Sequence, residues 1–423
     1  MSYEKQQIKE GITLHTIETN KFKTNLLSVF LTMPLLRENV TKDALISSVL
    51  RRGTKTMPSI EEISIKLEEM YGASFDCGID KIGEKHVLKF YLETINEEFL
   101  PQKENILKEG LNTIFDVVFN PLVENEKFKE EYVNGEKQKL RQIIDGKKDN
   151  KAKYALERTI EEMYTNKPYG LYKFGYIEDL EKINSSDLYN YYKEMISKCK
   201  IDIFVSGKIK KEEVKELVDK NENILKLQQR TIENEKVQFI ESIQEPQTIK
   251  EKMDITQGKL VLGLTVQNDN NKEGKYITLL YNMLLGGGAN SKLFQNVREK
   301  ASLAYTASSN YVRQMNNIFI RCGIEASNYE KALEIINKQL KDLENGDFSE
   351  EDLQNAKQTI TSTIKFIPDE QDTEITYYFG GEISNNFATL DEYEQKVTEV
   401  TREQIIDLAK KVKVHTIYFL ANN

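Results

Sequence analysis

The chain contains only three histidines, His15, His86 and His415, and they limit the metal chemistry that its sequence can support. A zinc hydrolase site built on one helix needs two histidines four residues apart, so that both rings face one ion. No such pair exists here, although a site that gathers all three side chains from distant segments remains geometrically open. His86 and His415 stand in alternating apolar patterns typical of strands. We therefore expect core or edge histidines rather than ligands.

A run of three glycines, Gly286 to Gly288, is the second feature that could do chemistry. It precedes a helical pattern, and free backbone N–H groups at such a place can cradle a phosphate. The run matches neither the P-loop nor the dinucleotide-binding fingerprint. The competing interpretation is an interhelical turn with Asn290 or Ser291 as N-cap.

The elements that must position these residues follow one order in each half of the chain. Strand patterns in the first half cover residues 11–17, 26–33, 73–79, 85–93 and 200–205, with helices at 43–52, after Pro58 and through most of 98–218. The second half gives strands at 259–266, 304–311, 317–325 and 412–420, with helices at 275–285, 291–300, 329–343, 349–367 and 374–384. Two copies of one unit explain this order better than one large domain.

The repeat predicts an α+β protein with two homologous units, each a mostly antiparallel sheet with helices packed on one face. We expect an N-terminal domain at residues 1–220 and a C-terminal domain at residues 246–423. The polar stretch between them, residues 221–245, has little periodicity and is predicted to be a linker.

Residues 285–305 (LGGGANSKLFQNVREKASLAY) resemble the second-domain signature of the M16 peptidases, the family of pitrilysin, insulinase and the mitochondrial processing peptidase. In that family a glycine-rich turn leads into a helix with Leu-Phe, then Arg-Glu-Lys, then a Gly-Leu-Ala-Tyr strand start. Ser302 stands where glycine is usual. Segments 167–170, 175–180 and 205–207 are similar to further M16 segments, so the resemblance covers nearly the whole chain.

The resemblance implies a zinc motif, His-x-x-Glu-His, on the first helix. Alignment on Gly53-Thr54 places Ala44 and Ser48 at the two histidine positions and Ser47 at the position of the general base. The third ligand position falls near Gln142 or Ile143. None of the four functional groups is present, so the resemblance implies no catalytic residue, no metal and no cofactor at this site.

The resemblance also implies two substrate-binding residues, Arg298 and Tyr305, at positions where the family has an arginine and a tyrosine near the active site. A guanidinium and a phenol can hydrogen-bond a peptide carbonyl. The alternatives are a surface ion pair of Arg298, for example with Glu299, and a half-buried strand aromatic at Tyr305.

From the resemblance we expect a catalytically inactive subunit that pairs with a zinc-bearing homologue and helps to process a peptide or protein. The chain is similar to bacterial members associated with the 5-aminopentanol modification of elongation factor P, and more distantly to those of bacteriocin maturation. Two alternatives stay open: a homodimeric peptide-binding scaffold without peptidase activity, and a metallopeptidase with a non-standard site around His15 or His86, which predicts bound zinc.

Composition restricts partners and location. The 423 residues include 59 Lys and Arg against 68 Asp and Glu, and this net charge of −9 has the wrong sign for nonspecific binding to nucleic acid or anionic lipid. The sequence offers no secretory signal and no apolar run of membrane-spanning length. Cys77, Cys199 and Cys322 are odd in number and far apart, which indicates reduced thiols. We expect a cytoplasmic protein.

Overall fold

The computed structural model describes residues 2–102, 104–232, 237–267 and 273–422, which form two compact units. Neither unit is continuous in sequence. Unit 1 consists of Met1–Asp145, Leu171–Lys236 and Pro368–Phe379, and unit 2 of Gly146–Gly170, Val237–Ile367 and Gly380–Asn423. Each unit therefore includes one segment from the other half of the chain.

Unit 1 is built on a six-stranded sheet in which each strand is antiparallel to its neighbours, except that β2 and β8 are parallel. The order across the sheet is β1 (Ser2–Lys9), β2 (Ile12–Glu18), β8 (Lys200–Gly207), β3 (Thr24–Pro34), β5 (Lys85–Ile95) and β4 (Ser74–Ile82). A separate two-stranded ribbon pairs β6 (Val123–Glu124) with β7 (Lys127–Phe128).

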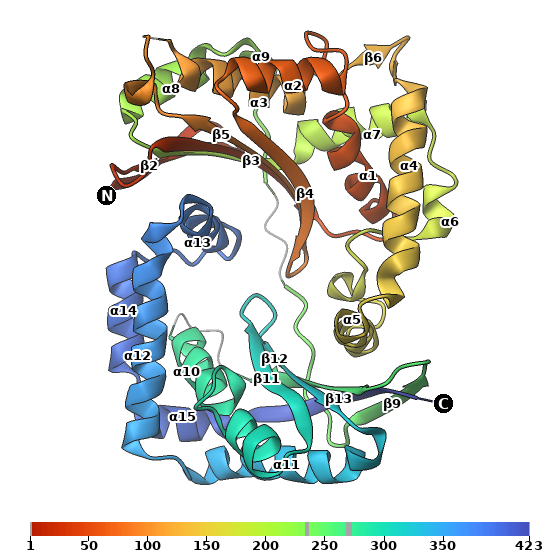
Figure 1. Cartoon of the computed structure of the whole chain (residues 1–423), viewed down its shortest axis with the longest axis vertical. Coiled ribbons are helices and arrows are strands. Elements are labelled where there is room, and N and C mark those ends of the chain that lie inside the picture. The colour runs from red at the N-terminus through yellow and green to blue at the C-terminus, as the bar shows by residue number, and fades with distance from the viewer. Residues whose placement is uncertain (1, 103, 233–236, 268–272, 423) are drawn as a thin grey trace. The chain divides into compact units, whose positions relative to one another are not determined.

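One face of this sheet packs against the helices that follow its strands. Successive strand side chains point to opposite faces, so Leu27, Val29 and Leu31 of β3 all enter the helical side of the core. Gly110 of α3 lies so close to the sheet that a Cβ there would be 2.8 Å from Leu27. The helices of unit 1 are α1 (Val40–Leu50), α2 (Ile60–Glu69), α3 (Ile106–Phe119), α4 (Glu130–Asp145), α6 (Ile177–Leu180), α7 (Ser185–Lys198), α8 (Lys211–Lys220) and α9 (Glu222–Lys226) (Figure 1).

The other face of this sheet is more polar and aromatic, and part of α13 (Gln371–Ile383) covers it. The ring of Phe379 lies 4.3 Å from that of Phe30, measured between centroids. At the start of the helix, Gln371 donates a side-chain hydrogen bond of 2.9 Å to the carbonyl oxygen of Ser206. An aromatic contact and a buried amide thus attach residues 371–379 to unit 1.

Unit 2 repeats the plan with a five-stranded sheet of order β11 (Ala304–Val312), β12 (Asn317–Ile324), β10 (Gly258–Val266), β13 (Val412–Ala421) and β9 (Gln247–Lys252). Its pairs are antiparallel except β13 with β9. Helices α10 (Gly274–Gly286), α11 (Tyr329–Asn345), α12 (Glu350–Phe366), α14 (Leu390–Glu399) and α15 (Arg402–Ala409) form one core with it. Helix α5 (Lys151–Met163) packs on the opposite face, where Tyr154 and Tyr418 both donate hydrogen bonds to Glu251.

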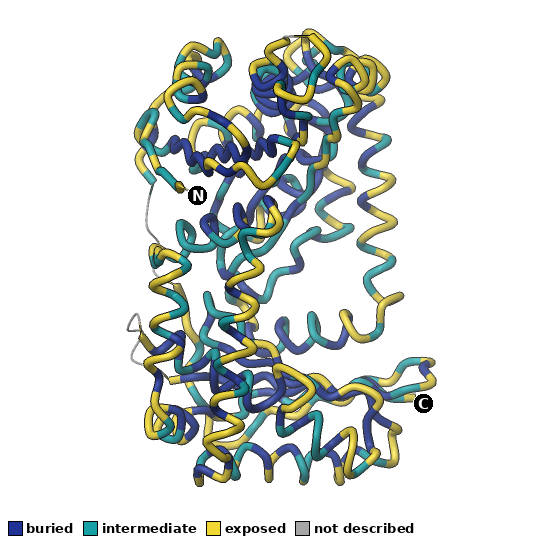
Figure 2. Tube along the Cα trace, turned by 60° about the vertical axis from the view of Figure 1, so that its left-hand side comes forward, coloured by how far each residue is buried: buried dark blue, intermediate teal, exposed yellow. Residues whose placement is uncertain are grey.

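The predicted fold class, an α+β protein with two sheets packed with helices, is confirmed. Helices were expected on one face of each sheet, but residues 371–379 and α5 also pack on the second faces, because each sheet receives a segment from the other half of the chain. The sequence patterns gave no sign of β1 and β9, which are edge strands with few buried positions. The start of the expected linker is ordered and packs on unit 1: it contains α9, and the buried Arg230 donates to the carbonyl oxygens of Ile196, Cys199 and Gln228. The central strands β3, β8 and β10 are buried along nearly their whole length, and Figure 2 draws buried residues in dark blue.

Among the residues that the structure describes, no helix combines the length and the apolar character that crossing a bilayer requires.

Candidate functional site

Helix α1 carries the three positions that align with the zinc motif, and it is one of the most deeply buried helices of unit 1. Ala44 and Ser47 are each 3% exposed, whereas Ser48 is half-buried. The helix consists almost entirely of apolar or small side chains, so it packs both on the sheet and on α4. The packing role of this helix is thus retained.

The side chains at these positions do not fit a zinc ion. Ala44 offers a methyl group, and the hydroxyl of Ser47 donates to the carbonyl oxygen of Ala44 at 3.1 Å within the same helix. Cys77 of β4 donates its thiol to the carbonyl oxygen of Ser47 at 3.3 Å, and burial raises the pKa of this thiol to about 11. It is therefore a neutral thiol near pH 7, whereas zinc binds the thiolate.

Helix α4 was expected to supply the third ligand position near Gln142, but Gln142 and Ile143 are exposed. The buried acid of α4 is Glu136, which is 4% exposed. Its Oε1 lies 2.7 Å from Nζ of Lys139 and 3.7 Å from Nη1 of Arg52, so cationic side chains already balance its charge. The sequence did contain a signal for Glu136: it lies four residues after Tyr132 and four before Leu140, in the buried stripe of the helix.

A buried polar network also holds α1 in place, by joining it to β5 and α7. Asp43, which is 0% exposed, accepts a hydrogen bond of 2.6 Å from Tyr191 and lies 2.9 Å from Nδ1 of His86. The other ring nitrogen of His86 lies 2.9 Å from the carbonyl oxygen of Lys173, which can only accept. Both ring nitrogens thus face acceptors, and we assign His86 as a doubly protonated imidazolium paired with Asp43.

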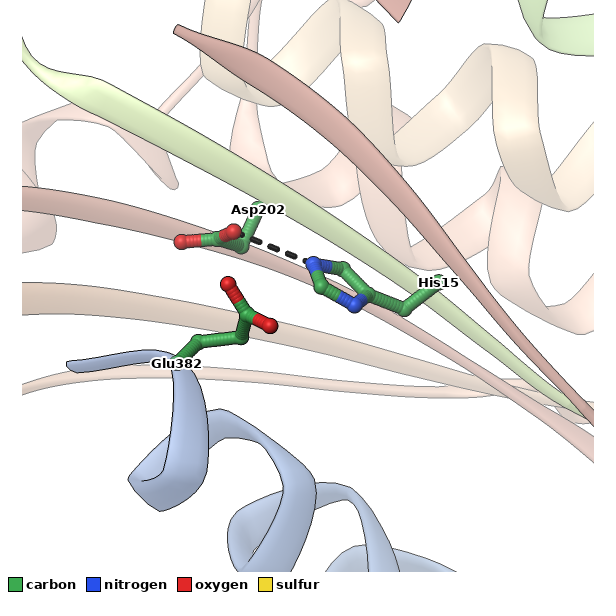
Figure 3. Close-up of side chains that lie close together, drawn as sticks. All are labelled: His15, Asp202 and Glu382. Atoms are coloured by element: carbon green, nitrogen blue, oxygen red, sulfur yellow. Dashed lines mark hydrogen bonds and ion pairs between the residues drawn. The ribbon is translucent and has the colours of Figure 1, made fainter. Parts of the chain in front are cut away.

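The other two histidines have structural partners of their own. His15 lies at 0% exposure in β2, with Nε2 3.0 Å from Oδ1 of Asp202 on the neighbouring strand β8 (Figure 3). Burial would raise the pKa of Asp202, but the hydrogen bond from His15 and the charge of Lys200 outweigh it and hold that pKa below its ordinary value. His415 is half-buried and bonds Thr416 through Nδ1 at 2.8 Å.

The glycine run ends α10 and leads into the segment that holds Arg298. Gly286 is required sterically, because a Cβ there would lie 2.5 Å from the backbone nitrogen of Ser309. Ser291 donates its hydroxyl back to the carbonyl oxygen of Gly288 at 2.5 Å. These contacts are those of a tight interhelical turn.

Arg298 and Tyr305 lie in two local irregularities of unit 2. Residues Phe294–Lys300, expected as part of an α-helix, form a π-helix, and the pairing of β11 with β12 shifts register between Ala304 and Thr306, which makes Tyr305 the extra residue of a bulge. Such irregularities are enriched at functional sites, where they redirect side chains. Both side chains point outward: Tyr305 is 69% exposed, and the exposed Arg298 guanidinium lies 4.5 Å above the ring of Phe294.

Of the two alternatives considered for these residues, the structure shows the ion pair of Arg298 but not a half-buried Tyr305. Nε of Arg298 lies 3.6 Å from Glu299, so the surface ion pair exists, although both side chains are exposed and such a pair contributes little stability. Tyr305 is far more exposed than a half-buried strand aromatic.

Ser302, between the π-helix and β11, has a φ of 53°, in the left-handed region that favours glycine. We expect Ser302→Gly to raise the free energy of unfolding by about 0.5–1 kcal/mol, because relief of the Cβ clash exceeds the added entropy of the unfolded chain. Urea titration of both proteins measures the difference. Ser302→Ala keeps the Cβ and should bring no gain; equal stabilisation by alanine would contradict the argument.

Comparison with known proteins places this arrangement in a family. The profile described as "Peptidase M16 inactive domain" matches residues 182–360. A Bacillus subtilis (strain 168) protein named "Probable inactive metalloprotease YmfF" is 34% identical over 410 residues, which is 97% of this chain and 96% of that protein. Among solved structures, a conserved protein from Enterococcus faecalis V583 has a TM-score of 0.90 at 25% identity, and a peptidase M16 inactive domain from Pseudomonas fluorescens has 0.82 at 16%; each match covers 100% of this chain and 99% of the other. The profile match and the full-length relative establish that the chain belongs to the M16 peptidase family.

Proposed function

We propose that this chain is a catalytically inactive M16 subunit of the cytoplasm, which pairs with a zinc-bearing homologue and contributes Arg298 and Tyr305 to the binding of a peptide substrate. The pathway that we favour, from the resemblance alone, is the modification of a translation factor or the maturation of a peptide. In this proposal the zinc belongs to the homologue, and this chain itself uses no metal or cofactor.

The observation that carries the proposal is the contrast between the two halves. Helix α1 has kept its packing, while its two histidine positions hold a methyl group and a hydroxyl, which cannot replace imidazoles in binding zinc. The position of the general base also holds only a hydroxyl, that of Ser47. In unit 2 the π-helix and the bulge still present an exposed guanidinium and an exposed phenol. A scaffold under no functional constraint would have little reason to retain exposed groups on irregular backbone.

The experiment is a reconstitution with the zinc-bearing homologue from the same organism, using an internally quenched peptide that the pair cleaves. We expect Arg298→Ala to lower kcat/KM of the pair by at least about tenfold, since hydrogen bonds from a charged donor contribute about 1.5–3 kcal/mol. Tyr305→Phe, which removes the hydroxyl alone, should have a smaller effect.

Lys292→Ala, in the same segment but outside the irregular backbone, is the control and should leave the rate unchanged. Full activity of the pair with both Arg298→Ala and Tyr305→Phe would reject the proposal. Size-exclusion chromatography of the chain alone and with the homologue tests the pairing; a stable homodimer that ignores the homologue would instead favour a peptide-binding scaffold.

A further inference from the structure

A cavity of about 430 Å³ lies among the helices of unit 1. Its wall comes from the connection between α1 and α2, from α2 and α3, and from the residues around the start of α9. None of the positions aligned with the zinc motif lines it. Its volume is at the small end of the range for ligand pockets.

Asp116 of α3 is the most deeply buried charged group in this wall, with 7% of its surface exposed. Its Oδ2 accepts a hydrogen bond of 2.5 Å from the hydroxyl of Thr56, and its Oδ1 accepts one of 2.6 Å from the amide of Asn120. Both partners are neutral, and none of the ion pairs formed by the described residues involves Asp116. A carboxylate this far from water ordinarily has a cationic partner.

The other charges of the wall are already balanced within the protein. Lys66 forms an ion pair of 2.9 Å with Glu109, Lys220 pairs with Glu216, and Glu222 lies 3.9 Å from Nζ of Lys226. None of these cations is directed to Asp116. The cavity therefore presents one uncompensated negative charge, at Asp116.

The site around Asp116 does not suit a metal ion. Metal sites in proteins need about three or more ligand groups that converge, and among the described residues Asp116 belongs to no cluster of three histidine, cysteine or carboxylate side chains. An organic ammonium ion needs one carboxylate together with neutral acceptors. Each carboxylate oxygen of Asp116 has a further lone pair beyond the bond that it already accepts.

We propose that this cavity binds a small aliphatic amine, with the ammonium group on Asp116. The remaining wall matches such a molecule. Met57 gives an apolar surface for a short carbon chain, and the amides of Asn112 and Asn221, which hydrogen-bond each other at 2.9 Å, are further polar groups of the wall. The ammonium group supplies the positive charge that Asp116 lacks.

The test uses n-butylamine as the probe and n-butanol as its uncharged match. The protein carries ¹³C-methyl methionine, and the Met57 signal is assigned from its loss in Met57→Leu. We expect butylamine to shift the Met57 signal saturably and butanol to shift it at least about tenfold more weakly, because only the ammonium can form a charged hydrogen bond.

Asp116→Asn removes the charge while its amide oxygen can still accept from Thr56, and it should weaken butylamine binding at least about tenfold. Glu109→Gln removes an acid that Lys66 already balances, so it should change binding less than Asp116→Asn does. Circular dichroism melting confirms that each variant is folded. Equal binding of butanol and butylamine, equal binding by Asp116→Asn, or no saturable shift of Met57 would each overturn the proposal.

Discussion

Asp43→Ala should lower the free energy of unfolding by about 3–5 kcal/mol, the range measured when one partner of a buried ion pair is removed. Asp43 and His86 are both 0% exposed, and their ring-to-carboxylate contact of 2.9 Å joins α1 to β5. Alanine would leave the imidazolium without a counter-charge and the hydroxyl of Tyr191 without an acceptor. Urea titration followed by far-UV circular dichroism measures the loss.

A double-mutant cycle separates the interaction energy between Asp43 and His86 from the cost of the cavity that each truncation creates. Once His86→Ala has removed the buried positive charge, Asp43→Ala should cost less than it does in the wild-type chain, and the two losses should fall short of additivity by at least about 1 kcal/mol. Ser48→Ala, on the same helix but half-buried, should change stability by about 0.5 kcal/mol or less. Additive losses for Asp43 and His86 would show that the two side chains do not stabilise each other.

Periodicity located those elements whose apolar positions are dense. The predicted strand at 259–266 became β10, Gly258–Val266, and the predicted hairpin became β11 with β12. The exchange of α5 and of residues 371–379 between units left no local signal, because an amphipathic helix has the same pattern whichever sheet it covers. Such assignments depend on tertiary contacts such as that of Phe379 with Phe30.

In the candidate site, too, the sequence predicted the positions of residues along the chain but not their local geometry or their partners. Alignment placed Ala44, Ser47 and Ser48 on one buried helix, and the structure puts them there. The local geometry of Arg298 and Tyr305 could not be predicted, since the π-helix at Phe294–Lys300 and the bulge at Tyr305 each depend on one hydrogen-bond shift that residue types do not encode. The pairing of Asp43 with His86 was also missed, because a single acid and a single histidine 43 residues apart give no pattern.

Glu374→Gln should stabilise the protein at pH 8 by up to about 3 kcal/mol and bring little gain near pH 4.5. Glu374 of α13 is 1% exposed, and its Oε2 has no hydrogen-bond partner among the described residues. Burial raises its pKa from 4.5 to about 7, and the charge of Lys21 only partly opposes this. The folded state therefore favours the protonated acid, and ionisation above pH 7 costs the folded state about 1.4 kcal/mol for each unit of the pKa difference.

The sign of this effect fixes the shape of the pH profile. A carboxyl whose pKa is higher in the folded than in the unfolded chain destabilises progressively as pH rises from about 4.5 to about 7, and the loss then levels off. Glutamine keeps the size and polarity of the side chain but does not ionise. All other groups titrate alike in both proteins, so the difference between their free energies of unfolding, measured by urea titration from pH 4.5 to 8, isolates Glu374. A difference that stays constant across this range would mean that Glu374 keeps its ordinary pKa and that residues 371–379 dock independently of its protonation.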